Sequence, residues 1–175
     1  MATENITTKY KLDISEFKAG ITEANKQIKL ANAEFKAATA GMDDWSKSSD
    51  GLQAKIKQLN STLDAQKSKL AAYRGQLEAN EKAYTENGKR AEELKKKLAD
   101  LAAQGIAKSS EEYKKYEKAP ANVEKEQAAN AAACDRLRVS VLNQEAAVGA
   151  AMYAAVASGV CDSLDKAAKI VLKYT

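Results

Sequence analysis

A seven-residue repeat of apolar side chains runs through the middle of the sequence and constrains the fold more than any other feature. One line of the repeat begins at Leu52 and the other at Ile56. Seven-residue spacing held over this length is typical of a left-handed coiled coil, because it keeps one stripe of a helix facing a partner. We therefore predict a long helix over residues 52–104. The residues expected at its helix–helix interface are Leu52, Ile56, Leu59, Leu63, Leu70, Tyr73, Leu77, Tyr84, Leu94, Leu98 and Leu101.

The predicted helix needs a surface to cover its apolar stripe. At 1.5 Å per residue it would be roughly 75 Å long, well beyond the diameter of a domain of this size. Gln66, Asn80 and Asn87 interrupt the stripe, and such polar residues define register or oligomeric state at a cost in stability. A parallel homodimer would place Lys69 of one copy opposite Arg74 of the other, which is unfavourable. Self-association in a specific bundle and an intramolecular antiparallel hairpin both remain open.

Another amphipathic helix, the first in the chain, precedes the long one. Its apolar residues are spaced alternately by four and three positions, which places them on one face of a helix ending near Ala40. The large residues of this face are Phe17, Ile21, Ile28 and Phe35. Before it, residues 9–14 alternate polar and apolar side chains and favour one short β-strand. We expect residues 1–8 to be disordered and residues 9–40 to form one segment.

Residues 41–51 are predicted to form a loop or hinge. Glycine, aspartate and serine are concentrated there, and these residues compete with helical hydrogen bonding. Trp45 is the only tryptophan of the chain, and we expect it to pack the bend rather than bind a ligand.

A third helix is predicted over residues 109–145. Gly105 ends the second helix, and Ser109 followed by Glu112 has the spacing of a capping box. The acidic start of this helix would complement the basic second helix, as a hairpin requires. Pro120 would cost about 3 kcal/mol or more inside a helix, so we expect a kink or break near Ala119.

Residues 146–175 form an alanine-rich tail that ends in a short helix capped by Asp162 and Ser163. The apolar stretch 146–160 is too short to span a bilayer, which needs about 20 apolar residues. Basic Lys166, Lys169 and Lys173 follow it, so contact with a membrane surface is an alternative.

Composition argues against catalysis and cofactors. Histidine is absent, which removes the commonest general base and metal ligand. Cys134 and Cys161 cannot form a closed zinc site by themselves, and we interpret them as reduced, buried side chains. Carboxylates such as Asp43, Asp44 and Asp100 are scattered and indicate solvated surface. We expect no enzymatic activity, no cofactor and no metal.

The charge pattern does not favour nucleic acid as the primary partner. The 28 basic and 24 acidic residues are spread along most of the chain, without a basic stripe or a glycine-rich phosphate loop. The N-terminus lacks a cationic start followed by an apolar block, so we expect synthesis in a cytoplasm.

Four segments resemble the N-terminal part of tape-measure proteins from tailed phages and prophages of Gram-positive bacteria. They are residues 10–21 (YKLDISEFKAGI), 24–38 (ANKQIKLANAEFKAA), 41–47 (GMDDWSK) and 52–60 (LQAKIKQLN). The resemblance covers about residues 8 to 145, with Pro120 and the alanine-rich tail departing from the pattern. It implies an all-α structural protein of the virion tail, made in the bacterial host cytoplasm and laid along the inside of the tail tube. Its chain length would set tail length, and its partners would be tail tube and tail assembly proteins.

Two other functions remain open. The heptads alone suffice for a coiled-coil scaffold or adaptor protein, and the apolar tail alone for a membrane-active helical protein. A fully helical chain of this length would measure only about 260 Å. Family members are much longer, so the resemblance implies a fragment, a truncated prophage product or a small relative.

Overall fold

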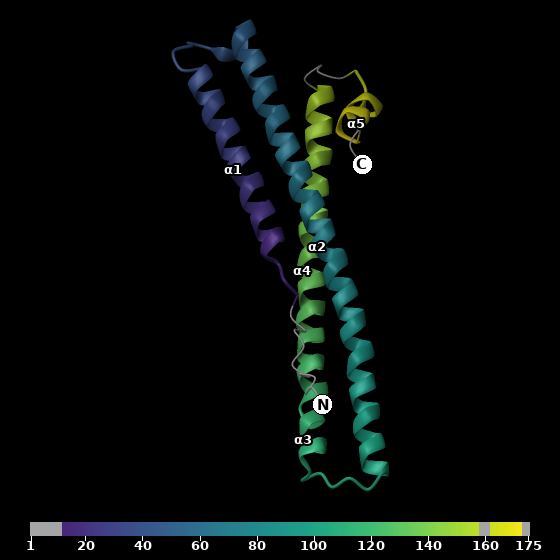
Figure 1. Ribbon diagram of the computed structural model, residues 1–175. Coiled ribbons are helices and arrows are strands. Elements are labelled where there is room, and N and C mark those ends of the chain that lie inside the picture. Colours follow the sequence, from purple (N-terminus) through teal and green to yellow (C-terminus); the bar gives the residue numbers. More distant parts are fainter. Residues whose placement is uncertain (1–11, 158–161, 173–175) are drawn as a thin grey trace. The chain divides into compact units, whose positions relative to one another are not determined.

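The computed structural model describes residues 12–157 and 162–172, which fold as helices joined by short connections (Figure 1). This confirms the predicted all-α class. The helices are α1 (Ser15–Ala38), α2 (Ser49–Ala103), α3 (Glu111–Glu117), α4 (Ala119–Ala157) and α5 (Leu164–Leu172), with a 3-10 turn, η1 (Trp45–Lys47), between the first two.

The chain divides into two compact units. Of the described residues, unit 1 contains 12–14 and 75–138. Unit 2 contains residues 15–74, 139–157 and 162–172. Helices α2 and α4 each contribute to both units, and every contact described below lies within one of them.

The predicted N-terminal strand is not formed by its described residues. Leu12, Asp13 and Ile14 have no regular secondary structure and lead directly into α1. Residues 9–11 of that prediction, and the expected disorder of residues 1–8, lie outside the described residues. A lone alternating segment needs a strand edge to pair with, and the described residues contain no strand.

Unit 2 contains an antiparallel hairpin of α1 and the first part of α2 (Figure 1). Helix α1 ends at a turn where Gly41 adopts a φ of 87°, a conformation that favours glycine. The Ser48 side chain then accepts a hydrogen bond from Gly51 N at 2.9 Å and caps α2. A methyl group added at Gly51 would lie 2.2 Å from the carbonyl oxygen of Trp45, so this close turn requires glycine.

Unit 1 contains a second antiparallel hairpin, between the last part of α2 and the first part of α4. Helix α2 ends with Gly105 at a φ of 74°, and the amide of Ile106 bonds back to the carbonyl of Leu101. Ser110 caps α3 by accepting a hydrogen bond from Tyr113 N at 3.2 Å. The cap is therefore Ser110, one residue after the Ser109 position of the expected capping box.

The chain departs from α3 at Lys118 and begins α4 at Ala119. Pro120 is thus the second residue of α4 rather than an interior residue. The first amides of a helix have no intrahelical partner, so a proline in this turn removes no helical hydrogen bond.

Helix α4 runs to Ala157, twelve residues beyond the predicted end of the third helix. Ser163 caps α5, with its side chain accepting from Lys166 N at 3.2 Å. The buried apolar residues of unit 1 are Ala91, Leu101, Ala119, Val123, Cys134 and Leu137, and those of unit 2 are Ala24, Ala31, Ala65 and Ala167.

Candidate interaction surfaces

The apolar face of α1 packs against α2 within unit 2. Its large residues Phe17, Ile21, Ile28 and Phe35 are half-buried, and Ala24 and Ala31 on the same face are buried. The Phe17 ring meets the Tyr73 ring edge-on with centroids 5.4 Å apart. Such pairs contribute about 0.5–1.5 kcal/mol beyond their buried area.

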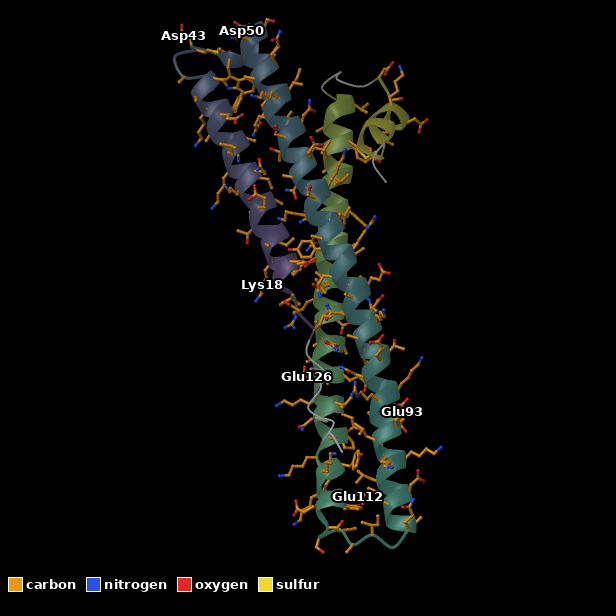
Figure 2. The ribbon with its side chains drawn as sticks, in the orientation of Figure 1. Lys18, Asp43, Asp50, Glu93, Glu112 and Glu126 are labelled. Carbon is orange, nitrogen blue, oxygen red and sulfur yellow. The ribbon has the colours of Figure 1, made fainter. Side chains whose placement is uncertain are left out.

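The loop end of this hairpin is closed by an aromatic cluster. Phe35 and Trp45 pack edge-on at 5.1 Å, and the ammonium group of Lys55 lies 4.9 Å from the Phe35 ring centroid. Trp45 therefore packs the bend, as its place in the sequence indicates. Figure 2 labels Asp43 and Asp50 at this end of the hairpin.

Polar contacts flank the packed face of α1. Glu34 pairs with Lys57 at 3.4 Å, and the Gln58 amide donates to Asn32 at 2.5 Å. A methyl group added at Gly20 would lie 3.8 Å from Cβ of Ala72, so the two helices are in close contact there as well. These contacts use the side of α2 that carries Ala54, Gln58, Ala65 and Ala72.

The predicted heptad interface is buried unevenly. Leu101 is buried and Leu63, Leu70, Tyr73, Leu77, Leu94 and Leu98 are half-buried. Leu52, Ile56, Leu59 and Tyr84 are exposed by 44–51%. Helix α1 covers roughly the opposite side of α2. Leu52, Ile56 and Leu59 therefore form an exposed apolar stripe in unit 2.

Polar amides occupy the seam of the unit 1 hairpin. Gln76, Asn80 and Asn87 on α2 and Asn130 on α4 are all buried. Asn80 donates to the carbonyl of Gln76 in its own helix, whereas the amide nitrogens of Gln76, Asn87 and Asn130 have no hydrogen-bond partner. The heptad pattern of α2 identifies Asn80 and Asn87 but not Gln76, and Asn130 lies seven residues from both Val123 and Leu137 on α4.

Ion pairs join the edges of the same hairpin. Nζ of Lys95 lies 2.7 Å from Oε1 of Glu124 and 3.2 Å from Oε1 of Glu92. The hydrogen bonds to these two carboxylates raise the pKa of Lys95. Arg138 lies 2.7 Å from Glu81, and this hydrogen bond raises the pKa of Arg138. Both pairs are about half exposed, so each stabilises the hairpin only weakly.

The second exposed apolar face lies on the unit 2 part of α4. Val139, Leu142 and Tyr153 are exposed by 58%, 64% and 66%. No charged residue occurs on α4 after Glu145. Loss of charge beyond Ala146 is the sequence signal for the Tyr153 end of this face and does not extend to Val139 and Leu142.

The scattered carboxylates behave as surface groups. Asp43 and Asp100 are exposed, while hydrogen bonds from Ser46 and Lys47 lower the pKa of Asp44. Among residues 12–157 and 162–172, no cluster of ligands could hold a metal ion. Within the same residues no helix combines the length and hydropathy of a membrane span.

Comparison with known proteins adds no relative. No family model, curated protein or solved structure matches the chain.

Proposed function

We propose that this chain is a structural protein of a phage tail, equivalent to the N-terminal part of a tape-measure protein. The observation that supports this proposal most directly is α2, an uninterrupted helix of 55 residues. A helix rises about 1.5 Å per residue, so α2 converts its residue number into a length of about 83 Å. Removing one heptad shortens such a helix by about 10.5 Å.

The proposal places the protein inside the tail tube, after synthesis in the bacterial host cytoplasm. Its partners there are tail tube and tail assembly proteins. The exposed apolar stripes of α2 and α4 supply faces through which helices of such partners can dock.

The experiment is a matched deletion in the phage that encodes the chain. Deleting residues 81–94 and 125–138 removes two heptads from each arm of the unit 1 hairpin, so its remaining residues keep their pairing. If the two helical arms lie end to end in the tail, the deletion of 28 residues should shorten the tail by about 42 Å. If they stay folded as a hairpin, the tail should be shorter by about 21 Å. Cryo-electron microscopy of purified tails measures the difference.

A control separates chain length from surface chemistry. Lys82→Ala with Lys89→Ala alters exposed residues of the deleted segment without changing its length, and tail length should then equal that of the parent phage. Unchanged tails in the matched deletion would rule out a ruler function.

The second candidate function is a coiled-coil scaffold or adaptor, favoured by the uncharged, exposed face at Leu142 and Tyr153. A scaffold uses this face to bind another helix, including that of a second copy. Leu142→Glu with Tyr153→Glu should then reduce self-association in sedimentation equilibrium and leave circular dichroism unchanged. A monomeric parent chain at all concentrations would argue against self-assembly.

A further inference from the structure

The seven-residue repeats of the unit 1 hairpin leave its register underdetermined by apolar packing. On α2 the line Asn80, Asn87, Leu94 and Leu101 repeats every seven residues, and on α4 the line Val123, Asn130 and Leu137 does the same. Between Val123 and Leu137, the half-buried alanines of α4 are Ala131 and Ala133, while Ala128, Ala129 and Ala132 are exposed. Methyl groups of equal size pack similarly after a shift of one repeat, so apolar contact alone discriminates poorly between registers.

Apart from the buried Gln76 and Asn80, which lie nearer the start of the hairpin on α2, a layer of amides interrupts this repetitive seam at one level. Position 88 lies seven residues from both Glu81 and Lys95, and position 131 lies seven residues from both Glu124 and Arg138. Since Glu81 pairs with Arg138 and Lys95 with Glu124, positions 88 and 131 lie opposite one another. Asn87 and Gly88 on α2 therefore share a level with Asn130 on α4.

Gly88 gives a side chain of the opposite helix access to the α2 backbone. The Gln127 amide donates to the carbonyl oxygen of Tyr84 at 3.4 Å. A methyl group added at Gly88 would lie 2.7 Å from that amide nitrogen. The absence of a side chain at Gly88 thus lets Gln127 lie across α2 at this level.

We propose that Asn87, Gly88, Gln127 and Asn130 form a register lock that selects one pairing of the α2–α4 hairpin. The buried amide nitrogens of Asn87 and Asn130 have no hydrogen-bond partner, so the layer lowers stability. A slide by one heptad sets Asn130 against Leu94 in one direction and against Asn80, another buried amide, in the other. In either direction the slide removes Gln127 from Gly88. The half-exposed ion pairs discriminate less, because screening by solvent weakens them.

The test replaces the layer and measures the register directly. Asn87→Leu with Asn130→Leu makes the α4 line apolar throughout and leaves Asn80 as the one amide of the α2 line, and the double variant should unfold at a higher temperature than the parent. Spin labels at Lys82→Cys and Lys125→Cys, two exposed positions offset by about 18 Å along the hairpin, report the register in a background of Cys134→Ala and Cys161→Ala. The parent should give one narrow distance distribution. The double variant should add a second population, with the offset changed by about 10.5 Å.

The matched control removes the ion pairs and keeps the layer. Glu81→Ala with Lys95→Ala should retain the single narrow distribution. The proposal is overturned if the leucine variant keeps one distance, or if the ion-pair variant acquires the second one. Circular dichroism of both variants establishes that each remains helical.

Discussion

Arg138 on α4 donates a hydrogen bond to Glu81 on α2, with Nη2 2.7 Å from Oε1, although 57 positions separate them in sequence. The pair joins the two arms of the unit 1 hairpin. Together with the pair of Lys95 and Glu124, it shows how far each arm extends along the other.

Reversing both charges of this pair should preserve its coupling. Arg138→Glu and Glu81→Arg should each lower the urea midpoint, because each places like charges together. The double reversal should recover part of the loss, and the coupling should vanish in about 1 M salt, where the Debye length falls to about 3 Å. Equal coupling at low and high salt would contradict an electrostatic contact.

Truncating the buried end of α2 should have a large effect. Leu101 is 2% exposed, so Leu101→Ala removes packed atoms and should lower the free energy of unfolding by about 2–5 kcal/mol. Leu142, which is 64% exposed, provides the matched control, and Leu142→Ala should change that free energy by no more than about 0.5 kcal/mol. Chemical denaturation measures both, and comparable losses would show that Leu142 is covered in solution.

Replacing each of two glycines within α2 by alanine should change the stability of the protein by different amounts. Nothing lies within 4 Å of a methyl group added at Gly75, so Gly75→Ala should stabilise the protein by about 1 kcal/mol through helix propensity. Gly88→Ala should gain less, because its methyl group displaces the Gln127 amide. Repeating Gly88→Ala in a Gln127→Ala background should restore the full gain, and thermal unfolding measures all four variants. Identical gains at Gly75 and Gly88 in the parent would argue against the Gln127 contact.

The Cys134 thiol should make stability fall at alkaline pH. Burial raises the pKa of Cys134 above its ordinary value of about 9. The folded thiol therefore keeps its proton where the unfolded one loses it, so unfolding releases a proton above that pH. This contribution is fully present below the unfolded pKa and is lost as pH rises through the folded pKa.

Urea unfolding between about pH 7 and pH 10 checks the sign. In a Cys161→Ala background, the parent should lose stability more steeply with pH than Cys134→Ala, while titration of lysines and tyrosines affects both proteins alike. Parallel pH profiles would show that the thiol titrates normally.

The sequence by itself determined that α1 and α2 are helical and which of their faces are apolar. Phe17 and Phe35 share one side of α1 because their spacing matches 3.6 residues per turn, and the same arithmetic identifies Leu94, Leu98 and Leu101 on α2. The interruption near Pro120 also follows from local chemistry. Its position in the first turn of α4, where it costs no hydrogen bond, depends on where Lys118 ends the previous helix.

Only the tertiary structure decided which surface covers each face. Periodicity specifies a direction around a helix but not the neighbour found there, so Leu52, Ile56 and Leu59 match the heptad and yet stay exposed, because α1 packs on the other side of α2. The buried amides of Gln76 and Asn130 follow from the same cause. Their burial depends on the arm lying opposite, and its register arises from contacts between residues far apart in the chain.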